Sequence, residues 1–248
     1  MTSVAEMFSV DDYMYFYGGY LTPERSTAET AAAVRLLHID RPMRILDVAC
    51  GFGRIANRLA LLGHQVTGLE YQPGFLEIAR REARLNNLDV DYIQGDMRAL
   101  DYPPTFDRAL MMFNSFGYFP DDENLRTLRG IAAALKPGGL LGFDVAHRDG
   151  VLNDFHPHYV TEKDADLLIN RFSFDVETGR LHNDRIVIRD GQRRDRPFSI
   201  RLYNLTEMRG LLAEAGFSLD AHYAEWDASP LELSSPSMVL IARKNTES

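Results

Sequence analysis

The chain has 248 residues, of which 45% are hydrophobic and 25% are charged, and its formal net charge at pH 7 is −9. This composition is typical of one globular α/β-sized domain and excludes fibrous and wholly disordered classes. The negative charge opposes binding to nucleic-acid phosphates, and the single cysteine, Cys50, excludes a disulfide framework within the chain. No apolar run approaches the roughly 18 residues of a membrane span, and residues 1–12 lack a leader pattern. We therefore expect a cytoplasmic protein that binds neither nucleic acid nor membrane.

The first 40 residues combine an aromatic segment with a helix. Residues 12–20 are rich in tyrosine and phenylalanine, and we expect them to form a lid in which Tyr17 faces a ligand. Ordinary packing of a first helix is the alternative interpretation. Thr22 and Pro23 carry the N-cap and first-turn signals of a helix that runs to about residue 37.

Residues 41–144 alternate between strand and helix patterns. Strands are predicted at residues 44–48, 65–69, 90–93, 106–113 and 140–144, with helices at 53–62, 73–86 and 121–135. A tight turn is predicted at 136–139, where proline precedes two glycines. Strands separated by helices of this length form βαβ units, so the pattern predicts a parallel sheet with helices on both faces.

The pattern changes after residue 144. Residues 145–203 are predicted to form an antiparallel β insertion after the fifth strand, with three extended segments from 166 to 203 and turns at 177–179 and 190–191. Residues 204–248 supply a closing helix, which has a capping-box signal at Asn204 and Glu207, and strands at 218–223 and 238–242. We expect one domain over 1–248, with 1–40 as the lid, 41–144 as the cofactor-binding half and 145–203 as the cap.

Acidic residues cluster at one predicted edge of this sheet. Asp47 lies within the first strand, four residues before the glycine loop that contains Gly51 and Gly53. Glu70 ends the second strand, and Asp96 follows the third. Carboxyl ends of parallel strands lie at the same edge, where ligands bind in this architecture. A buried strand has no structural need for an unpaired carboxylate, so this pattern indicates a ligand site.

The motif order DVACGFG, LE, GDM, FNSFGYF and LKPGG resembles the class I S-adenosylmethionine-dependent methyltransferases over residues 44–144. The resemblance implies a Rossmann-like sheet of seven strands, mostly parallel, and S-adenosylmethionine as the cofactor. It also implies that the cofactor contacts are Asp47, Ala49, Gly51, Gly53, Glu70, Tyr71, Asp96, Met97 and Phe113, with Tyr17 of the lid. The FNSFGYF stretch is locally similar to small-molecule enzymes such as amino-sugar N-methyltransferases.

Three residues are candidates for the chemistry, which would join a methyl group to nitrogen, oxygen or carbon of a small molecule. Asn114 and Tyr118 lie in the loop after the fourth strand, where the methyl group should point, and offer hydrogen bonds. His147 follows the fifth strand and is the preferred general base, because an ordinary histidine titrates near neutral pH. A surface histidine without a catalytic role is the alternative.

Two other functions remain open at this stage. Gly51, Gly53 and Ala56 also fit the dinucleotide pattern of a nicotinamide-dependent oxidoreductase, although that fold does not need Asp47. A non-catalytic protein that binds S-adenosylmethionine is the second alternative. His156 and His158 have no obvious third ligand, so no metal site is expected.

Residues 185–201 of the cap are dense in arginine, with six such residues that include Arg185 and Arg189, but aspartates interleave them. This pattern favours a solvated face or a homodimer edge over an RNA-binding surface. One or two of these arginines could reach a carboxylate or phosphate on the acceptor. Arg171, Arg201 and Trp226 are further predicted pocket walls, as are Tyr203 and Glu225.

Overall fold

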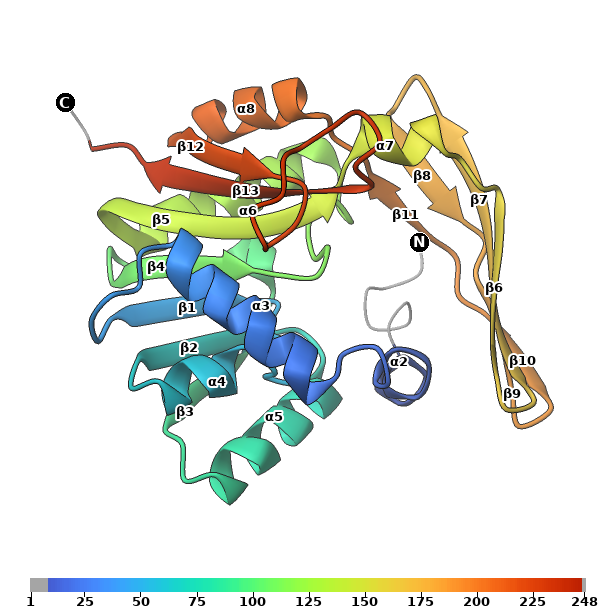
Figure 1. Cartoon of the computed structure of the whole chain (residues 1–248), viewed down its shortest axis with the longest axis horizontal. Helices are drawn as coiled ribbons and strands as arrows, with labels where there is room; N and C mark the ends of the chain where they lie inside the picture. The colour runs from blue at the N-terminus through green and yellow to red at the C-terminus, as the bar shows by residue number, and fades with distance from the viewer. Residues whose placement is uncertain (1–8, 247–248) are drawn as a thin grey trace.

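The computed structural model describes residues 9–246, and its centre is a seven-stranded sheet in the order β12-β13-β5-β4-β1-β2-β3 (Figure 1). These strands are β1 (Arg44–Val48), β2 (Gln65–Glu70), β3 (Val90–Gln94), β4 (Phe106–Met111), β5 (Leu135–Ala146), β12 (Phe217–Tyr223) and β13 (Ser237–Lys244). The five strands β5, β4, β1, β2 and β3 lie side by side in that order and are parallel, whereas β13 runs antiparallel to both of its neighbours, β5 and β12. The predicted fold class is confirmed.

Helices cover both faces of this sheet. One face carries α3 (Pro23–Leu36), α4 (Ala56–Leu61) and α5 (Pro73–Leu85), and the other carries α6 (Asp121–Ala134) and α8 (Leu205–Glu214). Each face has its own apolar core, with Leu59 and Leu76 fully buried on the first and Ile131 and Leu212 on the second. Strand β1 lies between these cores, and its apolar residues are buried on both sides.

The predicted turn at residues 136–139 lies inside β5 as a bulge. Phe106 of β4 pairs with Leu135, and Arg108 pairs with Leu140, so four residues of β5 loop out between the two pairs. Gly138 has φ +72°, which suits glycine. The sequence therefore predicts the irregular backbone at 136–139 correctly, but it places the start of β5 at residue 140 in place of Leu135.

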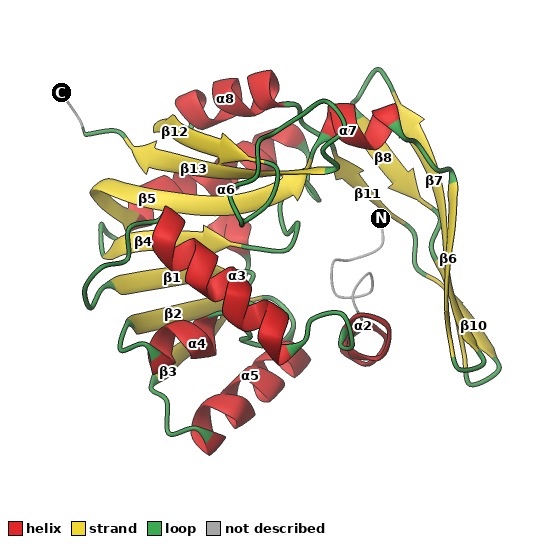
Figure 2. Ribbon diagram, in the orientation of Figure 1, coloured by secondary structure: helices red, strands yellow, loops and turns green. Residues whose placement is uncertain are grey.

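The insertion contains a short helix, α7 (Arg148–Asn153), and a second, antiparallel sheet (Figure 2). Its strands are β6 (His158–Lys163), β7 (Asp166–Asp175), β8 (Arg180–Asn183), β9 (Ile186–Arg189), β10 (Gln192–Asp195) and β11 (Phe198–Arg201). The turns predicted at 177–179 and 190–191 join β7 to β8 and β9 to β10. Sequence reasoning expected three extended segments over 166–203, where the structure has five strands, β7 to β11. It also missed β6, because that strand is polar, largely exposed and has no apolar alternation.

The helix α2 (Val10–Tyr17) lies between the carboxyl edge of the main sheet and the insertion (Figure 1). Ion pairs hold it to the second sheet: Arg189 reaches Asp11 at 2.8 Å, and Arg194 reaches Asp12 at 2.9 Å. The Lys163 ammonium also donates to the Tyr15 carbonyl oxygen at 2.6 Å. The lid and the cap are therefore joined to each other over the sheet edge.

Within residues 9–246, no helix has the length and apolar character needed to cross a membrane. The same range contains no cluster of three or more His, Cys, Asp or Glu side chains arranged to hold a metal ion.

Candidate functional site

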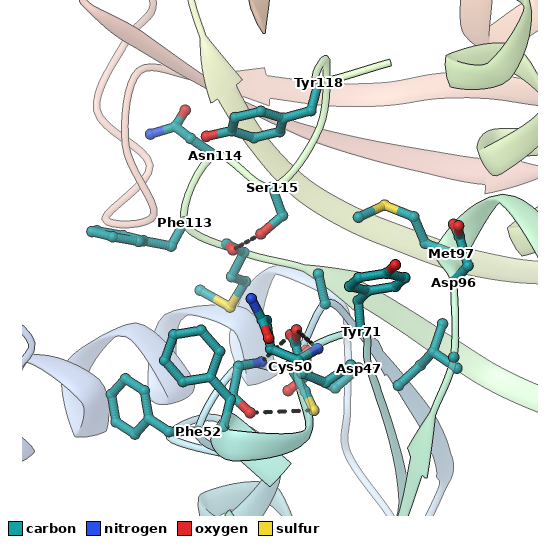
Figure 3. Close-up of a pocket in the computed structure, with 18 of the residues that line it drawn as sticks. Asp47, Cys50, Phe52, Tyr71, Asp96, Met97, Phe113, Asn114, Ser115 and Tyr118 are labelled. Atoms are coloured by element: carbon teal, nitrogen blue, oxygen red, sulfur yellow. Dashed lines mark hydrogen bonds between the residues drawn. The ribbon is translucent and has the colours of Figure 1, made fainter. Parts of the chain in front are cut away.

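A cavity of about 560 Å³ opens at the carboxyl edge of β1, β2 and β4 (Figure 3). α2 contributes Tyr13 and Tyr17 to its wall, and the insertion contributes Arg185. All but two of the site residues predicted from the sequence line it: Tyr17, Asp47, Ala49, Gly51, Glu70, Tyr71, Asp96, Met97, Phe113, Asn114 and Tyr118. Gly53 and His147 do not line it.

Asp47 places an unsatisfied carboxylate oxygen in the cavity wall. The side chain comes from the last residue but one of β1, near the carboxyl end of the strand, and is only 2% exposed. Its Oδ2 atom has no hydrogen-bond partner among the residues the structure describes. Burial raises the pKa of this carboxyl to about 7, with Glu70 adding to the shift and the Arg54 guanidinium opposing it. A buried acceptor without a partner is costly to the fold, so Asp47 is suited to receive a donor from a ligand.

Glu70 lies at the end of β2 and organises the loop after β1. Its Oε2 accepts the Gly51 amide at 3.0 Å, and its Oε1 accepts the Gln72 amide at 2.8 Å. Burial raises the pKa of the Glu70 carboxyl, and these amide donors oppose the shift. Each carboxylate oxygen has a second lone pair, so Glu70 can still accept from a ligand hydroxyl.

The two glycines of the loop have different tasks. Gly51 has φ +55° and faces open space in the cavity, where a ligand can approach the backbone. Gly53 has φ +77°, and a Cβ atom there would overlap the Tyr92 hydroxyl and lie 2.8 Å from the Ala79 Cβ. Gly53 therefore permits close packing of the loop on β3 and α5. It does not line the cavity, so the structure gives no support to its predicted contact with the cofactor.

Asp96 and Met97 lie together beyond β3. Asp96 caps a single turn of 3₁₀ helix, η1 (Met97–Ala99), by accepting the Arg98 amide at 2.9 Å. The Arg98 guanidinium also holds the Asp96 carboxylate, at 2.6 Å from Nη2 to Oδ2, and keeps the pKa of that carboxyl below its usual range. The Tyr71 side chain is 42% exposed at the same side of the cavity.

The loop after β4 is held in an unusual conformation by Asp144 of β5. Phe113 and Asn114 have φ +66° and +54°, which non-glycine residues seldom adopt. Their amides donate to the Asp144 carboxylate at 2.8 and 2.7 Å, and the indole of Trp226 donates to the same group at 3.0 Å. Because the carboxylate is buried, these three donors fix the direction in which the loop enters the cavity.

Asn114 and Tyr118 occupy the part of the wall above this loop (Figure 3). The Oδ1 atom of Asn114 is buried and has no partner within residues 9–246. Burial raises the pKa of the Tyr118 phenol to about 12, so it keeps its proton at neutral pH. The wall here thus carries an amide acceptor and a hydroxyl group that can donate, but Tyr118 cannot act as a base near pH 7.

His147 lies outside the cavity wall. It occupies the N-cap position of α7 without a capping hydrogen bond from its side chain, and it is only 5% exposed. Its Nδ1 lies 2.9 Å from the Ser235 carbonyl oxygen. The sequence places His147 at the correct end of β5, but the chain turns into α7 there and directs the residue toward the segment before β13. The geometry gives no support to its predicted role as the base.

Sequence reasoning missed several lining residues and predicted others wrongly. Arg54, Phe75, Arg98 and Glu123 line the cavity without having been proposed for the site, whereas Tyr13 belongs to the aromatic segment that the sequence predicts as a lid. The position of Arg54 directly after the glycine loop is a signal that could have identified it. The suggested wall residues Arg171, Arg201, Tyr203, Glu225 and Trp226 do not line the cavity. Trp226 is buried and reaches the site only through Asp144.

Comparison with known proteins gives a consistent result. Residues 45–139 match a family model described as a methyltransferase domain. A protein of Geobacillus sp. strain WCH70, provisionally assigned as a methyltransferase, is 29% identical over 199 residues, which cover 77% of this chain and 81% of that protein.

Solved structures share the whole fold. The CcbJ methyltransferase from Streptomyces caelestis superposes with a TM-score of 0.77 at 23% identity, over 89% of this chain and 90% of that one. CalS10 of Micromonospora echinaspora, an amino pentose methyltransferase solved with S-adenosylmethionine bound, gives a TM-score of 0.69 at 21% identity over 96% and 98% of the two chains. At these identities the structural likeness establishes the architecture, including the insertion.

Proposed function

We propose that this chain is a class I S-adenosylmethionine-dependent methyltransferase that methylates a nitrogen, oxygen or carbon atom of a small molecule. The observation that carries the proposal is the unpartnered Oδ2 atom of Asp47 in the wall of a covered cavity. A carboxylate in this position can form a charge-assisted hydrogen bond with a cationic donor of a ligand.

The residues around Asp47 fit the polar groups of S-adenosylmethionine. Asp47 would accept from the ammonium of the methionine portion, next to the exposed backbone of Gly51. Glu70 would accept from the ribose hydroxyls with its remaining lone pairs. Tyr71 and Met97 would cover the adenine, and Asp96 would accept from its amino group. The carboxylates of Asp47 and Glu70 belong to the ends of adjacent strands, which keeps these contacts in a fixed order.

Bound S-adenosylmethionine supplies a methyl group on a positively charged sulfur, which is already activated for displacement. The protein then has to align the acceptor, exclude water and compensate developing charge. Asn114 and Tyr118 would orient the acceptor, since they project from the loop that Asp144 fixes. α2 and the second sheet would keep water from the site. Catalysis by alignment is consistent with the absence of His147 from the wall.

A small acceptor is favoured by the cover over the cavity. α2 and the insertion are bound to each other across the sheet edge, and Tyr13, Tyr17 and Arg185 narrow the space from that side. A polymer would need an open groove in place of this cover. The acceptor of CalS10 is an amino pentose by its name, and a molecule of similar size would suit this cavity.

The first experiment is calorimetric titration with S-adenosylmethionine of the wild type and of Glu70→Gln. We expect micromolar binding to the wild type and an affinity lower by tenfold or more in the variant. In the variant, the backbone amide of Gly51 or of Gln72 would face the new side-chain NH₂ group in place of a carboxylate oxygen. Glu77→Gln, an exposed change on α5, is the matched control and should leave affinity unchanged.

NADH serves as the competing titrant for the dinucleotide alternative. Binding of NADH in preference to S-adenosylmethionine would refute the proposal and favour an oxidoreductase. If S-adenosylmethionine binds, a screen of small acceptors for release of S-adenosylhomocysteine identifies the methylated atom. Binding without turnover on any acceptor class would instead favour the non-catalytic alternative.

A further inference from the structure

Arg185 brings a positive charge into the cavity from the insertion. It lies between β8 and β9, and it lines the cavity together with Tyr17 and Tyr118. Its charge lowers the pKa of the Tyr118 phenol against the larger effect of burial, which places the guanidinium near that ring. The acceptor part of the cavity therefore has a cationic side.

The guanidinium of Arg185 is held in position by neutral groups. Its Nε donates to the Asn170 Oδ1 at 3.1 Å, and Asn183 donates to the same oxygen at 2.8 Å. Its Nη2 donates to the Tyr17 hydroxyl at 3.4 Å, and its Cζ lies 4.6 Å from the centroid of the Phe198 ring. A planar donor fixed in this way loses little side-chain entropy when it binds an oxyanion.

Arg185 differs from three other arginines of the insertion in its charge partners. Arg189 and Arg194 pair with aspartates of α2, and Arg201 pairs with Glu207 at 2.9 Å. Within residues 9–246, Arg185 has no carboxylate within ion-pair distance, and its Nη1 atom makes no hydrogen bond. A part-buried guanidinium with unused donors is suited to a bidentate contact with an oxyanion from a ligand.

A second arginine of the wall lies beside the cofactor residues. Arg54 pairs with Glu29, and its charge lowers the pKa of the Asp47 carboxyl against burial. The two arginines therefore act on different parts of the cavity: Arg54 on Asp47 and Arg185 on Tyr118. Arg185 therefore does not act on Asp47, the group that would hold the methionine portion of the cofactor.

We propose that Arg185 is a specificity-determining residue that binds an oxyanion, carboxylate or phosphate, of the methyl acceptor. The inference rests on the proposed function, because it assigns the space beside Tyr118 to the acceptor. It predicts that the acceptor is a small anionic compound with a ring or similar apolar body, which Tyr17 and Tyr118 would contact. The other polar group near this space, the Asn114 Oδ1, would accept a donor from the same molecule.

The test uses two probe pairs on protein saturated with S-adenosylhomocysteine. Benzoate is compared with benzamide, and phenyl phosphate with phenol, by ligand-observed NMR titration. We expect at least one anion to bind about tenfold or more tightly than its neutral partner. The pair that shows the larger ratio distinguishes a carboxylate acceptor from a phosphate acceptor. Neither anion binding at about 10 mM, or equal binding of anion and neutral partner, would overturn the proposal.

Variants of Arg185 connect this preference to the residue. Arg185→Gln should abolish the preference for the anion, and Arg185→Lys should keep part of it, since the charge remains but the bidentate geometry is lost. Arg193→Gln is the matched control, because Arg193 is exposed on β10 and pairs with Asp195. It should behave as the wild type.

The affinity for S-adenosylhomocysteine distinguishes a failure of the Arg185 inference from a failure of the proposed function. Both Arg185 variants should bind it within about threefold of the wild type, which also shows that they fold. A loss of tenfold or more in both would mean that Arg185 holds the cofactor, and the inference would be wrong while the proposed function stands. Failure of the wild type to bind S-adenosylhomocysteine would instead refute the proposed function.

Discussion

Replacing Asp47 by asparagine should stabilise the protein in the absence of cofactor while it weakens cofactor binding. Burial raises the pKa of this carboxyl from 3.8 to about 7 in the folded state. The unfolded chain ionises Asp47 near 3.8, so the folded state carries an extra cost that begins above that pH and is complete above pH 7. A difference of about three pKa units corresponds to a cost on the order of 4 kcal/mol at pH 8. Asparagine has no charge and avoids this cost.

The pH dependence of unfolding makes the prediction specific. Below about pH 3 the carboxyl is protonated in both states, and the variant should match the wild type in stability. The gap should widen by about 3 kcal/mol between pH 5 and pH 8, because the unfolded chain is already ionised over this range, whereas the folded state keeps its proton until the pH nears 7. Denaturant unfolding without cofactor, measured at several pH values, gives the free energy directly. A variant less stable than the wild type at pH 8 would refute the reasoning.

The affinity for S-adenosylmethionine should change in the opposite direction. Its ammonium needs the ionised carboxylate, so wild-type affinity should fall about tenfold for each pH unit below 7 and level off above it. Asp47→Asn should bind about tenfold or more weakly at pH 8 and show little of this pH dependence. Asp89→Asn, an exposed change before β3, is the control and should leave both stability and affinity unchanged.

Three further changes test how the site is built. Gly53→Ala should cost about 2–4 kcal/mol in denaturant unfolding, since φ is +77° and the Cβ would overlap Tyr92; a cost below about 0.5 kcal/mol would contradict the packing role. Asp144→Asn should lower kcat about tenfold or more with S-adenosylhomocysteine affinity within about threefold, because the Asn114 loop loses an acceptor; an unchanged kcat would show that the loop needs no such support. His147→Gln should keep kcat within about twofold, and a tenfold loss with normal cofactor affinity would restore it as the base.

The sheet and the cofactor side of the cavity could be predicted because both follow from local sequence rules. Apolar strands separated by amphipathic helices determine a parallel sheet, and the carboxyl ends of its strands meet at one edge. Asp47 and Glu70 end neighbouring strands, so their proximity in the cavity needs no long-range information. Tyr17 is a similar case, since a short aromatic helix just before α3 is confined to the same edge.

The acceptor side could not be predicted because it depends on how the insertion folds. Arg185 and Arg189 are equivalent in sequence, since both lie in a segment where arginine and aspartate alternate. Only the pairing of β7 with β8 and β9 places Arg185 over the cavity and Arg189 against α2. The same holds for His147, whose side chain is directed by the turn into α7.

Features that reduce stability collect at this one edge of the molecule. Asp47 is a buried carboxylate without a full set of partners, and Ala49, Phe113 and Asn114 adopt positive φ values. Each positive φ value costs on the order of 1–3 kcal/mol, and such features persist only where surrounding structure or a ligand compensates them. Asp144 compensates Phe113 and Asn114 within the protein, whereas nothing in the described chain compensates the Asp47 Oδ2. The stability that a ligand would restore is therefore concentrated at Asp47, which makes its substitution the most direct probe of what the cavity binds.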